Sequence, residues 1–196
     1  MKQLVLYDFD GTITHSDSFL PFIRFTKGQA SFLSGLLMLL PDVVLFKLRI
    51  IPNWKLKEKF LSHFFKGWEF GRLKDQGVKF AMNKLPDLIR PEAMENIRKH
   101  KEKGARILVV TASFDIWVEP WANSMDLEFI ATSAEVRDGY VSGQISGNNC
   151  YGPEKVKRIR TYLNLSEYDQ IFCYGDSAGD REMLEIGTQS YYRSFG

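Results

Sequence analysis

The chain has 196 residues, of which 44% are hydrophobic and 26% are charged, as in an ordinary globular protein. This length allows one domain with a sizeable core, or one domain that carries an insertion. The net charge of +2 gives no strong overall attraction to nucleic acid, so no nucleic-acid partner is expected. Two cysteines, Cys150 and Cys173, are too few for a disulfide framework and favour a reduced, cytoplasmic compartment.

Apolar runs and turn residues predict strands that alternate with helices. A buried strand is expected at residues 3–7, followed by a short helix at 18–26 with Asp17 or Ser18 as its N-cap. After a long helical region, the pattern predicts a helix at 91–103, a strand at 105–110, a helix at 115–123, a strand at 129–136, a hairpin turn at 138–139, a helix at 153–163, a strand at 170–174, a helix at 179–186 and a last strand at 190–192. This order predicts an α/β fold: a Rossmann-like parallel sheet with helices on both faces.

The segment 32–51 is heavily apolar. A membrane-spanning helix needs about 20 uninterrupted apolar residues, whereas Pro41 and Asp42 interrupt this segment, and Lys47 and Arg49 lie near its end. We therefore expect a buried helical hairpin. The alternative is a hydrophobic surface that meets lipid or a protein partner.

Helical patterns also fill residues 53–84, so the region 17–88 interrupts the alternation of strands and helices. We interpret residues 17–88 as an inserted helical cap, and residues 1–16 and 89–196 as the catalytic core. The cap holds 12 Lys and Arg against 6 Asp and Glu, a net charge of +6, and the remainder holds 14 against 18, a net charge of −4. A basic cap above an acidic core suggests an anionic substrate between them and a cation in the core. A solvated, lysine-rich helical surface explains the asymmetry equally well.

Two carboxylates, Asp8 and Asp10, follow the first predicted strand. On an extended chain such residues point to the same side, where they repel each other unless a cation or a shared proton compensates. Gly11 permits a turn that a side chain would hinder. Because these residues begin at position 8, we expect no cleavable signal peptide ahead of them.

Three further polar segments are predicted at or after the carboxyl ends of later strands, which is where open parallel sheets bind ligands. They are Thr111-Ala112-Ser113, Lys155 and the run from Gly175 to Asp180. Carboxylates suit Mg²⁺, while lysine and hydroxyl donors suit a phosphoryl group. Together they indicate phosphoryl transfer, although each residue alone could be a turn, a helix cap or a solvated side chain.

The ordered motifs Asp-x-Asp-Gly-Thr, Thr/Ser, Lys and Gly-Asp-x-x-x-Asp resemble those of the haloacid dehalogenase superfamily of phosphohydrolases, over essentially the whole chain. The resemblance implies that Asp8 is the nucleophile, which forms an aspartyl-phosphate. Asp10 would be the general acid and then the base that activates water. Its presence favours phosphate chemistry over dehalogenation, which needs no such acid.

The same resemblance implies the binding residues. Thr111, with Ala112 and Ser113 beside it, would bind the phosphoryl oxygens, and Lys155 would neutralise their charge. Mg²⁺ would bind Asp8, the backbone carbonyl of Asp10 and Asp176, with Asp180 in support.

A cap inserted after the first motif is similar to that of the phosphoserine phosphatase-like branch, in which an acidic residue recognises the substrate amine. Asp17 is the nearest match, although it could simply cap its helix. Gly179 departs from that branch, which tends to have Asn at this position. The apolar segment resembles caps of bacterial phosphatases that act on phospholipid headgroups such as phosphatidylglycerophosphate.

The sequence therefore predicts a Mg²⁺-dependent phosphomonoesterase for a small or lipid-linked phosphate ester. Such a protein would be cytoplasmic, and it could also bind peripherally to the inner face of the membrane. A membrane- or partner-docking protein with a vestigial site, and a phosphotransferase, are the other hypotheses.

Overall fold

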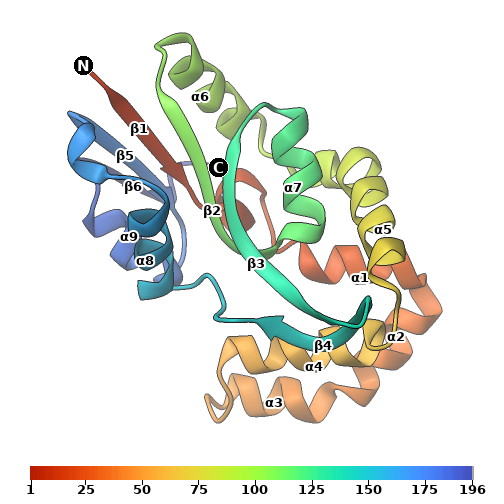
Figure 1. The fold of residues 1–196 in the computed structure, drawn as a ribbon. Coiled ribbons are helices and arrows are strands. Elements are labelled where there is room, and N and C mark those ends of the chain that lie inside the picture. The colour runs from red at the N-terminus through yellow and green to blue at the C-terminus, as the bar shows by residue number, and fades with distance from the viewer. Residues whose placement is uncertain (196) are drawn as a thin grey trace.

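A computed structural model describes residues 1–195 of the chain. Its centre is a six-stranded sheet with the order β4-β3-β2-β1-β5-β6 (Figure 1), parallel except for β4, which is antiparallel to β3. The strands are β1 (Gln3–Tyr7), β2 (Arg106–Phe114), β3 (Glu128–Arg137), β4 (Tyr140–Ser146), β5 (Gln170–Gly175) and β6 (Gln189–Tyr192). The expected α/β fold with a largely parallel sheet is confirmed.

Strand β1 lies between β2 and β5, and its alternating side chains supply both cores of the sheet. Val5 and Tyr7 pack into one hydrophobic cluster, whereas Leu4 and Leu6 pack into the other. All four side chains are fully buried, as expected for a central parallel strand covered on both faces. Strands β2, β3 and β4 lie on one side of β1, and β5 and β6 lie on the other. The strand order therefore reverses at β1, and the crevice beyond its carboxyl end is the expected ligand site of such a sheet.

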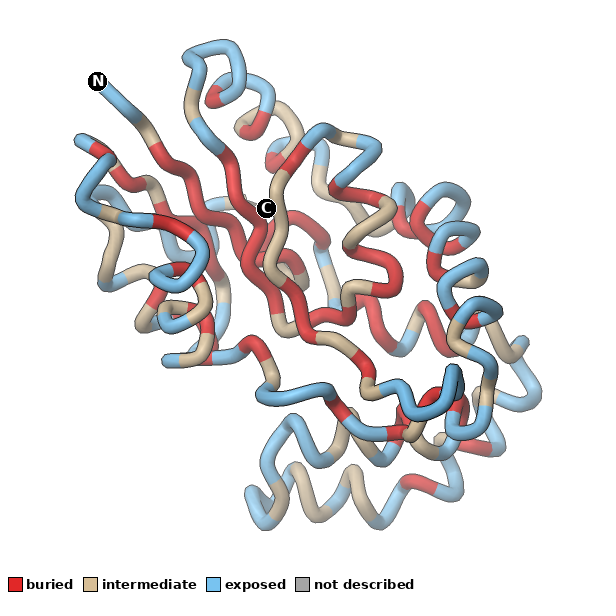
Figure 2. Tube along the Cα trace, viewed as in Figure 1, coloured by how far each residue is buried: buried red, intermediate tan, exposed pale blue. Residues whose placement is uncertain are grey.

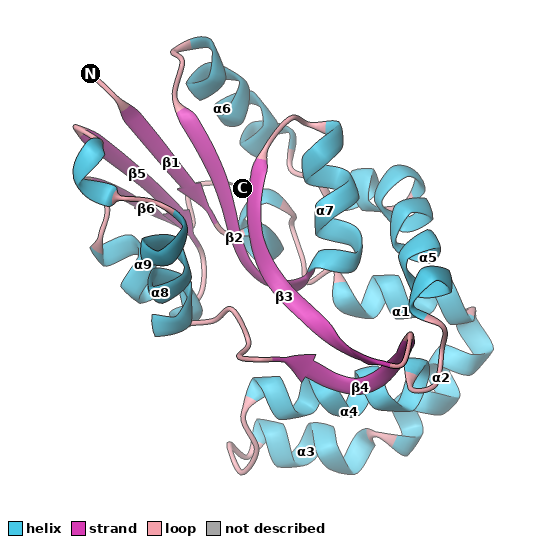
Figure 3. Cartoon of the chain, in the orientation of Figure 1, coloured by secondary structure: helices cyan, strands magenta, loops and turns pink. Residues whose placement is uncertain are grey.

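Four helices cover the two faces of this sheet. The α8 and α9 helices cover one face, and α6 and α7 cover the other (Figures 1 and 3). Ile159 of α8 and Met183 of α9 belong to the cluster of Leu4, while Ile97 of α6 and Trp117 of α7 belong to the cluster of Val5. These helices are α6 (Pro91–Glu102), α7 (Asp115–Ser124), α8 (Pro153–Tyr162) and α9 (Arg181–Glu185).

Five helices fill the insertion between β1 and β2. They are α1 (Phe19–Lys27), α2 (Gln29–Met38), α3 (Leu40–Lys47), α4 (Asn53–Phe65) and α5 (Phe70–Asn83). Helix α5 packs on α7, and α4 packs on β4. Phe22, Phe65 and Phe80 of the insertion share one continuous hydrophobic cluster with Trp117 of α7, so an aromatic core holds the inserted helices to the rest of the fold. Figure 2 shows that buried positions continue from the sheet into α7 and the inserted helices.

Several predicted boundaries differ from the structure. Strand β2 continues beyond residue 110 to Phe114, with a register shift against β3 between Val110 and Phe114. The helical region 53–84 is divided between α4 and α5 by a turn that contains Gly67 in the left-handed conformation (φ 79°). The helix expected at 179–186 is a short 3₁₀ turn at Ala178–Asp180 followed by α9.

The prediction of a buried hairpin at 32–51 is wrong. Helices α2 and α3 meet at a bend of 58°, because Pro41 stands in the first turn of a new helix. Most of the pair is exposed, and Gly35 and Leu39 are its buried residues. Within residues 1–195, each helix taken singly is too short or too polar to cross a membrane, whereas α2 and α3 together pass on length and composition alone.

The close contact between α5 and α7 yields a prediction. A Cβ at Gly77 would lie 2.0 Å from the carbonyl oxygen of Ile116 in α7, so Gly77→Ala must push the two helices apart. We expect a loss of about 1–3 kcal/mol in unfolding free energy, measured by urea denaturation. Gly71→Ala in the same helix, where a Cβ meets nothing closer than 3.8 Å, should be neutral or slightly stabilising. Equal effects of the two substitutions would contradict this packing.

Candidate active site

The chain turns sharply where β1 ends. Asp8 leaves the strand in an extended conformation, and residues Phe9–Ile13 form one tight turn in which Asp10 and Gly11 have non-helical backbone angles. Gly11 has φ 85°, and a Cβ there would lie 2.3 Å from Oδ2 of Asp176. Both the backbone conformation and the space beside Asp176 therefore require glycine. The turn also gives the two aspartates different neighbours, although the chain was expected to stay extended.

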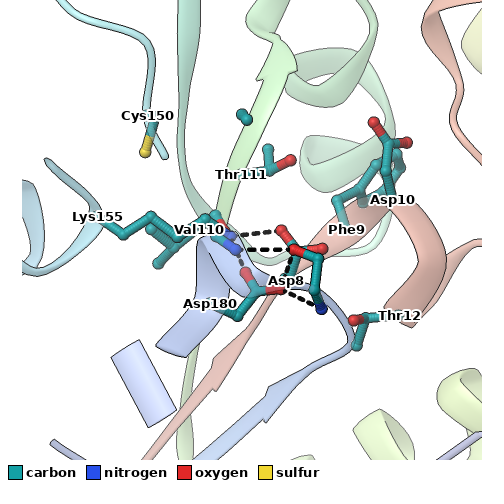
Figure 4. A network of polar contacts seen from close by, with 12 residues as sticks. Asp8, Phe9, Asp10, Thr12, Val110, Thr111, Cys150, Lys155 and Asp180 are labelled. Carbon is teal, nitrogen blue, oxygen red and sulfur yellow. Dashed lines mark hydrogen bonds and ion pairs between the residues drawn. The ribbon is translucent and has the colours of Figure 1, made fainter. Parts of the chain in front are cut away.

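The Asp8 carboxylate is buried beside a buried lysine. Lys155, on the first turn of α8, donates from Nζ to Asp8 Oδ1 at 2.5 Å, to Asp180 Oδ1 at 2.6 Å and to the carbonyl oxygen of Val110 at 2.7 Å (Figure 4). All three ammonium protons thus have acceptors. Burial would lower the pKa of Lys155, but the charges of Asp8 and Asp180 overcome it and raise that pKa. Burial raises the pKa of Asp8 to about 7, although Lys155 opposes the shift.

Two further carboxylates lie close to Asp8. Asp176 follows β5, and its Oδ1 accepts a hydrogen bond from Thr12 Oγ1 at 3.2 Å. Asp180 holds the same loop, because its Oδ2 accepts from the backbone nitrogen of Ser177 at 3.0 Å and from Ser177 Oγ at 2.8 Å. Burial would raise the pKa of Asp180, but Lys155 outweighs it and lowers that pKa.

The donor set fits a hard divalent cation. Asp8, Asp176 and Asp180 each offer a carboxylate oxygen, and these oxygens lie within 4.8 Å of one another. Three carboxylates face one ammonium group, which leaves two negative charges that a divalent cation would neutralise. Such oxygen ligands suit Mg²⁺. Asp8 and Asp176 are the residues that would hold it, with Asp180 beside them.

Asp10 belongs to a second hydrogen-bonded group. Its Oδ1 accepts from the backbone nitrogen of Ser18 at 3.0 Å, and its Oδ2 accepts from Ser113 Oγ. Ser113 Oγ lies 3.2 Å from Ser18 Oγ, which in turn accepts from Trp117 Nε1 at 2.9 Å. Because an indole nitrogen can only donate, this chain runs from Trp117 through the two serines to Asp10. Burial raises the pKa of Asp10 to about 6, and Asp17 adds to the shift, while Ser113 and Ser18 oppose it.

The remaining predicted residues lie around these two groups. Thr111 is buried within β2, and its Oγ1 accepts from the backbone nitrogen of Ser113 at 3.0 Å. Asp17 accepts from the backbone nitrogen of Phe19 at 2.9 Å, so it does cap the start of α1. Gly179 lies against the ring of Tyr151, where a Cβ would approach within 2.2 Å. A side chain at residue 179 would therefore displace Tyr151.

Lys57 was not predicted as a site residue from the sequence. It lies on α4, is partly buried, and donates from Nζ to the carbonyl oxygen of Ala112 at 2.8 Å. Burial lowers its pKa, although the nearby carboxylates of Asp10 and Asp17 oppose the shift. The inserted helices thus place one ammonium group next to Asp10. Lys55, Lys57 and Lys59 alternate along one short segment, and no sequence pattern distinguishes Lys57 as the lysine that reaches the site.

Comparison with known proteins identifies the family to which the chain belongs. The haloacid dehalogenase-like hydrolase family matches residues 5–185, and the chain belongs to that family. Protein CicA of Caulobacter vibrioides is 36% identical over 195 residues, which cover 98% of this chain and 86% of that protein.

Two solved structures share the fold. A protein with unknown function from Bordetella pertussis Tohama I has a TM-score of 0.83 at 22% identity, with 97% of this chain and 89% of that chain covered. A phospho-aspartyl intermediate analogue of phosphoserine phosphatase has a TM-score of 0.68 at 19% identity, with 96% and 85% covered. The predicted superfamily and its phosphoserine phosphatase-like fold are confirmed.

Removal of the buried ammonium should destabilise the fold. Lys155→Met leaves Asp8 and Asp180 buried without their shared partner, so we expect a loss of about 3–5 kcal/mol in unfolding free energy at neutral pH. Lys157→Met on the same helix is the control, since Lys157 is exposed and lies 3.8 Å from Glu154; it should change stability by less than about 0.5 kcal/mol. Urea denaturation of both variants tests this, and a similarly small effect of Lys155→Met would show that the ion pairs do not hold the fold.

Proposed function

We propose that the chain is a Mg²⁺-dependent phosphomonoester hydrolase that acts through an aspartyl-phosphate. The observation that carries the proposal is the cluster of Asp8, Asp176 and Asp180 around one buried ammonium group, that of Lys155. The family membership and the fold shared with phosphoserine phosphatase support it.

In the first step, a carboxylate oxygen of Asp8 attacks the phosphorus and the bond from phosphorus to the alcohol oxygen breaks. Asp10 donates its proton to that oxygen as the alcohol leaves. In the second step, Asp10 takes a proton from water, the water oxygen attacks phosphorus, and the bond to Asp8 breaks to release inorganic phosphate. Two steps through a covalent carboxylate intermediate replace one difficult displacement.

The surrounding residues prepare these two aspartates. Mg²⁺ bound at Asp8 and Asp176 would neutralise phosphoryl charge, which otherwise repels an anionic nucleophile. The positive charge of Lys155 would stabilise the same phosphoryl charge, and the hydroxyl of Thr111 would donate a hydrogen bond to a phosphoryl oxygen. The hydrogen bonds from Ser113 and Ser18 hold the Asp10 carboxyl in one orientation. We propose that residues 17–88 form the cap that closes this site. We also propose that the protein is cytoplasmic.

The nucleophile assignment predicts the effect of a single substitution. Asp8→Asn should reduce hydrolysis of an aryl phosphate by about a thousandfold or more, because the amide cannot attack phosphorus. Asp75→Asn on the exposed surface of α5 should leave the rate unchanged. Treatment of the unaltered protein with EDTA should also abolish hydrolysis, and added Mg²⁺ should restore it. Full activity of the Asp8→Asn protein would refute the mechanism.

For the substrate, we propose a small phosphate ester whose remainder carries charge, as phosphoserine does. Besides burial, Asp17 raises the pKa of Asp10 and Lys57 lowers it, so both charges act close to Asp10. We propose that this carboxylate and this ammonium group face the leaving alcohol. These charges would match an amine and a carboxylate of a substrate. A lipid-linked phosphate ester is the second candidate, favoured by the exposed apolar side chains of α2 and α3. The intact set of site residues argues against a docking protein with a vestigial site.

Kinetics with two substrates can test the roles of Asp17 and Lys57. Asp17→Asn keeps the oxygen that caps α1 but removes its charge, and Lys57→Met removes the ammonium group. For phosphoserine we expect each variant to lower kcat/KM by about tenfold or more, with little change for an uncharged aryl phosphate. Lys66→Met, at the exposed end of α4, is the control. A phosphatidylglycerophosphate assay in the same panel decides between the two substrate classes, and equal losses on every substrate would exclude a role in recognition.

A further inference from the structure

Helices α2 and α3 carry two apolar stripes, of which one packs against the hydrophobic core and the other lies at the surface. Phe32, Leu36, Leu39 and Val43 pack against the hydrophobic core. One position further along the chain, a second stripe repeats the same helical spacing and is exposed; it consists of Leu33, Leu37, Leu40, Val44 and Leu48. A helix at the surface of a globular protein usually presents polar residues on its outer side. The second stripe therefore leaves about half or more of each side chain open at the surface of residues 1–195.

Neighbouring residues extend this stripe into a patch. Met38, Ile50 and Trp54 are exposed as well, and Leu37, Leu48 and Ile50 reach 72, 65 and 63% exposure. Eight of the eighteen large hydrophobic side chains that are exposed in the described chain fall between residues 33 and 54. We call these eight the outer apolar face: Leu33, Leu37, Met38, Leu40, Val44, Leu48, Ile50 and Trp54. A concentration of this kind marks a contact surface.

The charges around the outer apolar face are basic. Asp42 is the one acidic residue between positions 29 and 57, and Lys59 lies 3.6 Å from its carboxylate. Lys47, Arg49 and Lys55 are exposed at the end of α3 and the start of α4. Their long side chains can place charge in the headgroup layer while their stems stay among apolar groups. Trp54 beside them is the residue type that favours a membrane–water boundary.

The outer apolar face lies away from the catalytic groups. Helix α3 packs on α4, and α4 packs on β4, so α3 forms the outer edge of the molecule (Figures 1 and 3). Lys57 reaches from α4 toward Ala112 of β2. A contact at the outer apolar face therefore leaves the catalytic groups uncovered.

We propose that the outer apolar face docks on the surface of a lipid bilayer that contains anionic headgroups. Apolar side chains would enter the headgroup boundary while Lys47, Arg49 and Lys55 pair with lipid charge. A second copy of the chain fits less well, because a two-fold contact through the same face would oppose like basic groups. The 58° bend between α2 and α3 and their exposed polar ends fit a helix pair that lies on the surface.

Co-sedimentation with vesicles tests the docking directly and requires no catalysis. The unaltered chain should sediment with vesicles of phosphatidylcholine and phosphatidylglycerol, and much less with phosphatidylcholine alone. Leu37→Asp with Leu48→Asp should abolish sedimentation. Val78→Asp with Met82→Asp on α5 is the matched control: both residues are exposed apolar side chains, at 46 and 47%, outside the outer apolar face. The control should sediment like the unaltered chain.

Charge variants test the electrostatic part. Lys47→Gln, Arg49→Gln and Lys55→Gln should each weaken binding to the anionic vesicles by about fivefold. Absence of sedimentation with any vesicle would overturn the proposal. So would self-association in gel filtration that the Leu37→Asp and Leu48→Asp double variant abolishes, because the face would then bind a second copy. Equal binding to neutral and anionic vesicles would overturn the assigned role of the basic residues. Because sedimentation is read without substrate, its failure is separable from a failure of the proposed hydrolase activity.

Discussion

The buried ammonium group of Lys155 is the constraint on which the rest of the site depends. Its three hydrogen bonds join the end of β1 at Asp8, strand β2 at Val110 and the loop after β5 at Asp180. A charge in this position is costly unless every proton has an acceptor and opposite charge lies nearby. The lysine therefore fixes three segments that are far apart in the sequence. The same arrangement leaves an excess of carboxylate charge, which a divalent cation beside Asp8 would neutralise.

Asp10 depends on a different part of the structure. The chain of hydrogen bonds from Trp117 through Ser18 and Ser113 joins α7, the start of the inserted helices and β2 at one carboxyl group. Trp117 is also fully buried among the aromatic rings that attach the insertion to the core, including Phe19 and Phe22. The orientation of Asp10, the group proposed to move protons, is thus coupled to the packing of the inserted helices. Asp8 is instead held by the core, through Lys155 at the start of α8.

Much of the core could be predicted from the sequence, because its determinants are local. Apolar runs that stop shortly before Asp8 and Asp176 predicted the ends of β1 and β5 to within one residue, whereas β2 continues beyond Thr111 to Phe114. Parallel strands bring their carboxyl ends together. The contribution of Lys57 could not be predicted, since it depends on how α4 packs on the sheet and not on any pattern around the residue. The burial of 32–51 was mispredicted for a related reason. Hydrophobicity shows that a segment avoids water, but it does not show whether the same chain supplies the cover.

Helix α4 lies between the site and the outer apolar face, so the inserted helices contribute to both. Lys57 of α4 reaches the carbonyl oxygen of Ala112, whose neighbour Ser113 donates to Asp10. Helix α3 packs on α4 and carries much of the outer apolar face. A bilayer at that face would touch α3 and the start of α4, not Asp8 or Asp10, both of which lie at the carboxyl end of β1. Docking would thus raise the local concentration of the enzyme at a membrane. The proposed substrate, a small charged phosphate ester matched to Asp17 and Lys57, is the same whether or not the chain is docked.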